Sequence, residues 1–222
     1  MSQNLYKIFY ENFKSDLDKI CLEIPDYKKM SFKDLDILSA HFASFLHELG
    51  LKKGDRMICQ IDKSLSAIGL YLGCLRKGVI YTPLNTSYTN DEVEYFINNI
   101  EPKLFVCRPE SKSTIKDICS RLNVPSFVAI GKNDDDPVLS EILSTEPLNI
   151  FENCSDKDVA AILFTSGTTG KSKGAMITHG NLSSNAIALR EIWGFTSEDI
   201  LLHALPIFHV HGLFVALNTA LL

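Results

Sequence analysis

The ten residues TSGTTGKSKG, from Thr165 to Gly174, have the composition of a loop that binds phosphate. They include three glycines, five hydroxyl side chains and two lysines, and they include no carboxylate. Glycines let backbone N–H groups approach an anion closely, hydroxyls donate further hydrogen bonds, and lysines supply positive charge. An apolar stretch typical of a buried strand, VAAILF, leads directly into these residues, which is the usual position of a ligand loop in a parallel sheet. We therefore expect a phosphate-binding loop; the alternative is a polar turn that binds nothing.

The letters Gly170, Lys171 and Ser172 also end the Walker phosphate loop, but the spacing does not fit. A Walker loop has four residues between its two glycines, so that its backbone N–H groups wrap the β-phosphate. Counting back from Gly170 places Thr165 where the first glycine is required, and Gly167 lies two residues too close. The stretch is therefore predicted to be a different kind of phosphate loop.

Composition and charge point to a soluble globular protein that binds small molecules. The chain has 222 residues, 45% of them hydrophobic, and a mean hydropathy of +0.06, which is enough apolar material for a sizeable core. A net charge of −5 without a basic block argues against a surface for nucleic acid or anionic membranes. No window reaches the roughly 18 uninterrupted apolar residues of a membrane span.

The cysteines and the N-terminal residues indicate the cell compartment in which we expect the protein. The six cysteines form no Cys-x-x-Cys pair and no His/Cys cluster at zinc spacing, so neither a metal site nor a disulfide framework is predicted. Residues 1–20 contain acidic side chains throughout, and they lack both the apolar core of a secretory signal and the Arg-rich character of a mitochondrial transit peptide. We therefore expect reduced thiols and a cytoplasmic location.

Strand and helix patterns alternate up to residue 130. Strands are expected at 56–61, 79–84, 103–107 and 126–130, and helices at 32–50, 64–78, 90–100 and 113–122. Ser31 and Asp34 form a capping-box pattern before the first helix, and Gly78 supplies a stop for the second. The alternation predicts right-handed βαβ units, and hence an α/β fold with a mostly parallel sheet covered on both faces. Residues 131–158 are acidic and rich in turns, which indicates a surface connection with about one helical turn.

The segment ILFTSGTTGKSKGAMITHGNL, residues 162–182, resembles the signature of the adenylate-forming (AMP-binding) enzymes. This superfamily includes acyl-CoA synthetases, firefly luciferase and the adenylation domains of peptide synthetases. Residues 69–107 and 201–218 are similar to other segments of the family, in the expected order. Ser172 stands where most members have proline, and together with LPIFHVHGLFVALN and PLNTSYTNDEVEYFI it makes the malonyl-CoA synthetases the most similar group.

The resemblance implies a ligase that works in two steps. Family members join a carboxylate to ATP as an acyl-adenylate, with Mg²⁺ present and pyrophosphate released, and then transfer the acyl group to the thiol of coenzyme A. The expected small-molecule partners are therefore ATP, CoA and a carboxylic acid. Lys171 falls at a variable family position and is interpreted as a solvated charge. The residues that the match places on the β- and γ-phosphates are Thr165, Ser166, Gly167, Thr168, Thr169, Gly170 and Lys173.

The resemblance also assigns roles to two histidines in FHVHG. The family histidine at the position of His209 lies beside the acyl pocket and moves between the two half-reactions, and His211 belongs to the version found in malonate enzymes. A histidine can hydrogen-bond a carboxylate or partly neutralise its charge, which suits a dicarboxylic substrate. The alternative is that one or both rings are structural histidines in an apolar turn.

The resemblance assigns the whole chain to the N-terminal part of the large AMP-binding domain. Residues 1–158 correspond to a first α/β subdomain with its connection, and residues 159–222 to the beginning of the phosphate-loop subdomain. The adenine and Mg²⁺ segment, the ribose aspartate and the C-terminal domain with its adenylation lysine have no match here. We therefore expect the 222-residue chain to be inactive alone. It is either part of an enzyme, for malonate or alternatively for another short carboxylic acid, or a non-catalytic remnant; the intact glycines and Lys173 favour an enzyme.

The chain ends within an apolar run, PIFHVHGLFVALNTALL. A helix ending at Leu222 is expected to leave its last carbonyl groups and its apolar face uncovered. We therefore expect association through this surface.

Overall fold

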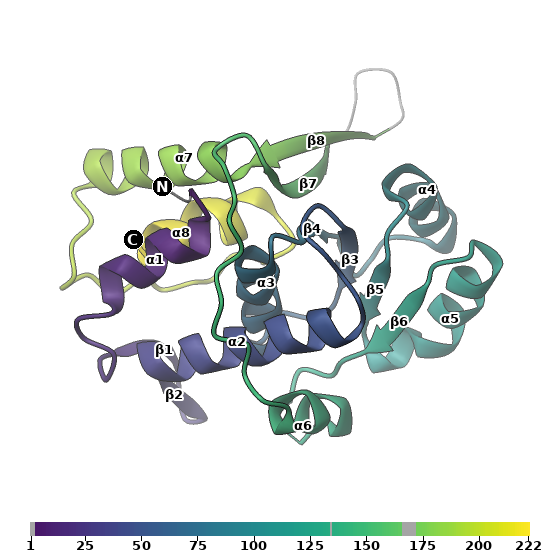
Figure 1. Cartoon of the computed structure of the whole chain (residues 1–222), viewed down its shortest axis with the longest axis horizontal. Helices are drawn as coiled ribbons and strands as arrows, with labels where there is room; N and C mark the ends of the chain where they lie inside the picture. The colour runs from purple at the N-terminus through teal and green to yellow at the C-terminus, as the bar shows by residue number, and fades with distance from the viewer. Residues whose placement is uncertain (1–2, 134, 166–171) are drawn as a thin grey trace.

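The computed structural model describes residues 3–133, 135–165 and 172–222. Within these residues, six strands form one sheet in the order β6-β5-β3-β4-β7-β8. They are β3 (Arg56–Gln60), β4 (Ile80–Pro83), β5 (Leu104–Cys107), β6 (Ser126–Ala129), β7 (Val159–Thr165) and β8 (Lys173–Thr178). Neighbouring strands are parallel except for β7 and β8, which run antiparallel. The α/β fold with a mostly parallel sheet is confirmed (Figure 1).

Helices cover both faces of the sheet. They are α1 (Leu5–Phe13), α2 (Phe32–Glu48), α3 (Leu65–Lys77), α4 (Asn90–Ile100), α5 (Lys112–Arg121), α6 (Pro137–Ser144), α7 (His179–Trp193), α8 (Asn218–Ala220), a 3-10 helix at Pro109–Ser111 and a π-helix, η2, at His211–Leu217. Met57 and Cys59 of β3 belong to the core cluster that includes α2 and α3, whereas Ile58 belongs to the cluster that includes α4 and α5. Since successive side chains of a strand point to opposite faces, both faces of the sheet are packed, as expected.

Local sequence rules account for the ends of the main helices. The Ser31 hydroxyl accepts a hydrogen bond from the Asp34 N–H at 3.1 Å, and the Asp34 carboxylate accepts one from the Ser31 N–H at 2.9 Å. The predicted capping box is therefore confirmed. Helix α3 ends at Gly78, whose φ of 68° is a left-handed conformation that glycine adopts without strain.

Two glycines let α2 and α3 pack closely. A Cβ atom on Gly73 would lie 2.7 Å from the Phe42 Cβ and 3.1 Å from the backbone nitrogen of Ala43. A Cβ atom on Gly69 would meet only side-chain atoms of Leu38 and Phe42. Every residue of α3 is buried, so this helix lies at the centre of the molecule. Its two ends therefore fix the positions of the loop that precedes it and of strand β4, which follows it.

Several elements were not predicted from the sequence. The chain forms an antiparallel hairpin of β1 (Ile20–Ile24) and β2 (Lys28–Ser31), and β8 and α7 follow the phosphate-loop stretch. Most β8 side chains are exposed, so the strand lacks the apolar alternation that identifies strands from sequence. The connection at 131–158 was expected to have about one helical turn, and it contains the eight-residue helix α6, which begins at the Asp136 cap.

The expectation of an uncovered apolar C-terminal run is wrong. Its large side chains pack into the main core cluster: Leu213, Phe214, Leu217 and Leu221 are all buried. The most exposed apolar side chains lie earlier, at Ile192, Ile200 and Leu202. Across the residues that the structure describes, no helix has the length and apolar character needed to cross a membrane.

Candidate functional site

The predicted phosphate-binding stretch joins two paired strands. Thr165 is the last residue of β7 and Lys173 the first of β8, and the two lie directly opposite each other in the antiparallel ladder. Both side chains are exposed. The hairpin therefore brings the first and last residues of the predicted phosphate site together. The remaining five, Ser166, Gly167, Thr168, Thr169 and Gly170, lie outside the described residues, so their contact with phosphate stays a prediction.

Helix α4 holds this hairpin at Ser172, directly before β8. The Tyr95 hydroxyl donates a hydrogen bond to the carbonyl oxygen of Ser172 at 2.7 Å. The rings of Tyr95 and Phe96 contact Phe164 of β7, with centroid separations of 6.4 and 4.5 Å. The sequence did not indicate Tyr95, because its hydrogen-bond partner, Ser172, lies 77 positions further along the chain. The contact makes Tyr95 a positioning residue for the backbone at Ser172, directly before Lys173.

The two predicted histidines form a pair. The His209 and His211 rings are stacked, with centroids 5.3 Å apart and planes 17° from parallel, and their Nδ1 atoms are 3.4 Å apart. The backbone N–H of His211 also approaches the His209 Nδ1 atom, at 3.4 Å. Both residues are exposed. Two exposed imidazoles in contact present N–H groups that can donate to a carboxylate.

The turn that carries this pair is tight. A Cβ atom on Gly212 would lie 2.1 Å from the carbonyl oxygen of Pro206, so no other residue fits there without movement of the backbone. The pair lies on a different element from the phosphate hairpin. His211 begins η2 and His209 lies two residues before it, whereas Thr165 ends β7 and Lys173 begins β8. The structure thus brings the two histidines into contact, and of the predicted phosphate residues it places Thr165 opposite Lys173.

A third histidine, His179, is buried and has a structural role. It begins α7, and its Nδ1 atom accepts a hydrogen bond from the Leu5 N–H at 3.1 Å. Burial lowers the pKa of His179 to about 4; the Asp158 carboxylate has a smaller raising effect and the Lys53 ammonium a further lowering one. The ring is therefore neutral at pH 7 and carries its hydrogen on Nε2. Because it connects α1 to α7, we interpret it as an anchor for the N-terminal helix.

The cysteines do not supply a nucleophile or a metal site. All six are described by the structure, and none forms a disulfide. Burial raises the pKa of the Cys59 and Cys107 thiols to about 12, so both stay protonated at neutral pH. Among the described residues, no group of three or more His, Cys, Asp or Glu side chains is placed to hold a metal ion.

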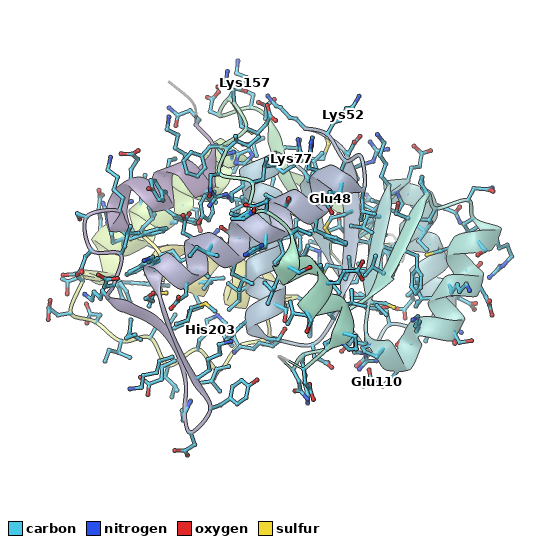
Figure 2. The ribbon with its side chains drawn as sticks, turned by 60° about the horizontal axis from the view of Figure 1, so that its bottom comes forward. Glu48, Lys52, Lys77, Glu110, Lys157 and His203 are labelled. Carbon is cyan, nitrogen blue, oxygen red and sulfur yellow. The ribbon has the colours of Figure 1, made fainter. Side chains whose placement is uncertain are left out.

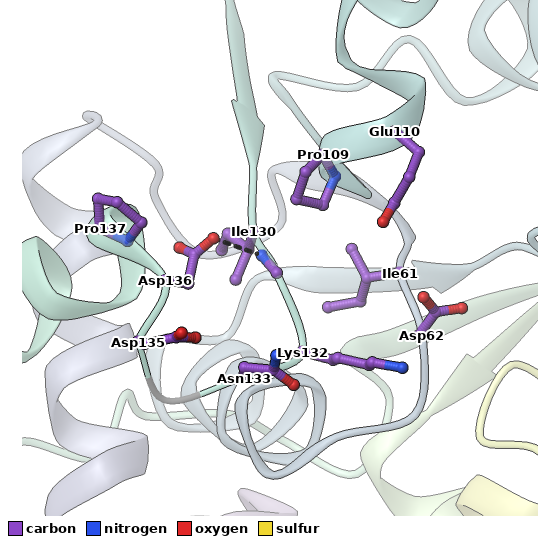
Figure 3. Close-up of a pocket in the computed structure, with 11 residues that line it drawn as sticks. Ile61, Asp62, Pro109, Glu110, Ile130, Lys132, Asn133, Asp135, Asp136 and Pro137 are labelled. Carbon is purple, nitrogen blue, oxygen red and sulfur yellow. Dashed lines mark hydrogen bonds between the residues drawn. The ribbon is translucent and has the colours of Figure 1, made fainter.

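A cavity of about 380 Å³ lies beyond the ends of β3, β5 and β6, but its charge does not suit an anionic ligand. Its polar lining includes Asp62, Glu110 and Asp135 together with one lysine, Lys132 (Figure 3). The Asp136 carboxylate, also in the lining, is occupied by the N–H groups of Gly131 and Leu139. Since like charges repel, this acidic lining is a poor match for a phosphate or a carboxylate.

Comparison with known proteins identifies the family. The profile of the AMP-binding enzymes matches residues 9–222. The chain belongs to the AMP-binding enzyme family. A probable CoA ligase, CCL9, from Humulus lupulus is 30% identical over 189 residues, a match that covers 82% of this chain and 35% of that protein. A malonate–CoA ligase from Arabidopsis thaliana is 33% identical over 175 residues, covering 76% of this chain and 28% of the ligase.

Solved structures of the family share the fold over the whole chain. The crystal structure of ATP-bound MatB from Rhodopseudomonas palustris is 39% identical to this protein, with a TM-score of 0.92. The match covers 100% of this chain and 44% of MatB. The chain therefore spans less than half the length of these three relatives.

Proposed function

We propose that this chain is the N-terminal part of an ATP-dependent carboxylate–CoA ligase that acts on malonate. The observation that carries the proposal is the similarity to ATP-bound MatB, at 39% identity and a TM-score of 0.92 over the whole chain. Two malonate–CoA ligases among the relatives, from Arabidopsis thaliana and Xenopus laevis, support the choice of acid. Residues 1–158 and 159–222 are proposed as parts of two subdomains; β7 continues the sheet of the first by pairing with β4.

The first proposed step forms the acyl-adenylate. A carboxylate oxygen of malonate attacks the α-phosphorus of ATP; the new acyl–oxygen–phosphorus bond forms as the bond to the β-phosphate oxygen breaks, and pyrophosphate leaves. Lys173 and the hydroxyl and backbone N–H groups from Thr165 to Gly170 would hold the β- and γ-phosphates and stabilise the charge that develops on the leaving pyrophosphate. The exposed Thr165 and Lys173, opposite each other with no carboxylate in the stretch, fit a triphosphate. Mg²⁺ bound with the nucleotide would offset its charge.

The second proposed step transfers the malonyl group to coenzyme A. The CoA sulfur forms a thioester bond to the acyl carbon, the carbon–oxygen bond to AMP breaks, and the thiol proton leaves to solvent. His209 and His211 are proposed to bind a carboxylate of malonate through their ring N–H groups. The exposure and contact of the two rings support this role. In a buried turn, the ring nitrogens of such a pair would instead form hydrogen bonds with other protein groups.

The test is ATP–pyrophosphate exchange by the protein made from the full reading frame that encodes this chain. Malonate, methylmalonate, acetate, oxalate and 4-coumarate are compared, since relatives include ligases for oxalate and 4-coumarate. Exchange that depends on malonate supports the proposal. Exchange with another acid and not with malonate would replace the substrate, and a folded protein that exchanges with none of them would be a non-catalytic remnant.

Two further predictions accompany this proposal. The 222-residue chain assayed alone is expected to give no exchange, because the family segments for adenine, ribose and the adenylation lysine have no match in it. The cytoplasmic location stays a prediction, which fractionation of cells that express a tagged full-length protein would check.

A further inference from the structure

A long, exposed segment leads from α7 to the histidine pair, and few of its side chains are buried. Of residues 201–206, Leu201, Leu202, Ala204, Leu205 and Pro206 are exposed, and Ile207 is the first buried one. A segment with so little buried surface has weak packing to select one conformation. Its polar contacts must therefore contribute most to its order.

One of these contacts comes from the start of α3. The Lys63 ammonium group donates hydrogen bonds to the carbonyl oxygens of His203 and of Leu205, the latter at 3.0 Å. Lys63 directly precedes Ser64, the N-cap residue of α3, so its backbone is fixed to the most buried helix of the protein. Its partners lie 140 and 142 positions along the chain. Lys63 thus connects a rigid element to the exposed segment.

The second contact is made by the side chain of His203. Its Nε2 atom lies 2.8 Å from the carbonyl oxygen of Gly212, the residue that follows His211. Because a carbonyl oxygen only accepts, the His203 Nε2 atom must carry a hydrogen, which both the Nε2–H tautomer and the imidazolium provide. Figure 2 shows His203 in the lower half of the view, with Lys157 at the top. Lys63 thus binds the backbone of His203, and the His203 ring binds the turn that carries His209 and His211.

We propose that Lys63 and His203 are positioning residues that hold His209 and His211 in their stacked arrangement. Lys63 fixes the incoming backbone, and His203 closes the turn at Gly212. At the same turn the Gly212 backbone packs directly on Pro206, since a Cβ atom there would lie 2.1 Å from the Pro206 carbonyl oxygen. The effect on malonate binding rests on the proposed function, whereas the effect on the order of the turn does not.

The first test measures the order of the turn in the 222-residue chain. Hydrogen exchange is followed at the Leu213 amide, which donates to the His209 carbonyl oxygen at 3.0 Å, together with the ring Cε1–H NMR signals of His209 and His211. Lys63→Met and His203→Ala are each expected to speed exchange at Leu213 about tenfold and to shift both ring signals toward those of an unfolded peptide. His203→Gln, whose amide nitrogen can still donate to Gly212, is expected to restore slow exchange.

Lys19→Met is the matched control. The Lys19 ammonium group donates to the carbonyl oxygen of Ser197 at 2.7 Å, so it makes the same kind of contact to an earlier part of the same segment. This variant is expected to leave the Leu213 amide and both ring signals unchanged. Unchanged exchange and ring signals in both Lys63→Met and His203→Ala would overturn the proposal, as would equal effects of Lys19→Met.

The second test separates positioning from general structure. In the protein made from the full reading frame, Lys63→Met and His203→Ala are expected to raise the KM for malonate about fivefold or more, with the KM for ATP unchanged. Equal changes in both KM values would overturn a specific role at the acyl site. If the unmodified protein has no activity with malonate, the proposed function fails, and the hydrogen-exchange result alone decides whether Lys63 and His203 hold the pair.

Discussion

Tyr95 of α4 donates its hydroxyl hydrogen to the carbonyl oxygen of Ser172, 77 positions along the chain, at 2.7 Å. The bond lies next to Lys173, at the point where β8 begins. It connects a helix that packs on one face of the sheet to the end of the predicted phosphate loop. The position of the Lys173 backbone is therefore fixed from outside the hairpin.

In the protein made from the full reading frame, Tyr95→Phe is expected to raise the KM for ATP without unfolding the protein. A lost hydrogen bond of this kind costs about 1 kcal/mol, which corresponds to about a fivefold rise in the KM for ATP in the exchange assay. Tyr88→Phe is the control, because its ring packs on the same Phe96, at 4.9 Å between centroids. Equal KM values for Tyr95→Phe and the unmodified protein would contradict the role assigned to Tyr95.

The two lysines of the phosphate-loop stretch are expected to differ. Lys173→Met should lower kcat/KM for ATP about 100-fold, because it removes a charge proposed to stabilise the leaving pyrophosphate. Lys171, which lies outside the described residues, is interpreted from its variable family position as a solvated charge, so Lys171→Met should change kcat/KM for ATP less than about threefold. Steady-state exchange assays at varied ATP concentration measure both values. Similar losses in the two variants would mean that Lys171 also binds phosphate.

The sequence predicted the parts of the fold that depend on short-range rules. Ser31 and Asp34 are three residues apart, so the capping box could be seen directly, and Gly78 marked the end of α3 in the same way. Contacts between distant residues could not be predicted this way. His179 accepts from Leu5, 174 positions away, and its burial depends on how α1 and α7 pack. Likewise, β8 is a strand because it pairs with β7, and its exposed side chains gave no periodic signal.

The packing of α2 against α3 predicts different effects at two glycines. Gly73→Ala places a Cβ atom against the Phe42 Cβ and the Ala43 backbone, which cannot move without shifting α2, so we expect a loss of about 1–3 kcal/mol in the free energy of unfolding. Gly69→Ala meets side-chain atoms only, the Leu38 Cγ and Cδ2 at 2.7 and 2.8 Å and the Phe42 Cδ2 at 3.0 Å, which can shift without moving the α2 backbone, and it gains helix propensity of about 1 kcal/mol. Urea unfolding of both variants tests the contrast. A Gly73→Ala protein as stable as Gly69→Ala would show that the two helices can separate at little cost.

The buried His179 predicts how stability depends on pH. Its pKa is about 4 in the folded protein and has the ordinary value of 6.5 in the unfolded chain, so between these values the unfolded state binds more protons. Stability therefore rises with pH across this window; it is fully present above about pH 6.5 and is lost as the pH falls toward 4. Between about pH 7.5 and pH 5, the loss due to His179 is expected to be about 2 kcal/mol.

His179→Asn isolates this contribution. The amide oxygen of asparagine can accept the Leu5 N–H in place of the imidazole Nδ1, but the side chain does not titrate. Asp158 and Lys53, the charged groups that act on His179, are the same in both proteins. Urea unfolding at several pH values is expected to show the unmodified protein losing about 2 kcal/mol more than the variant between about pH 7.5 and pH 5. Parallel stability curves would mean that folding does not lower the pKa of His179, and so that α1 is not anchored through an imidazole that burial keeps neutral.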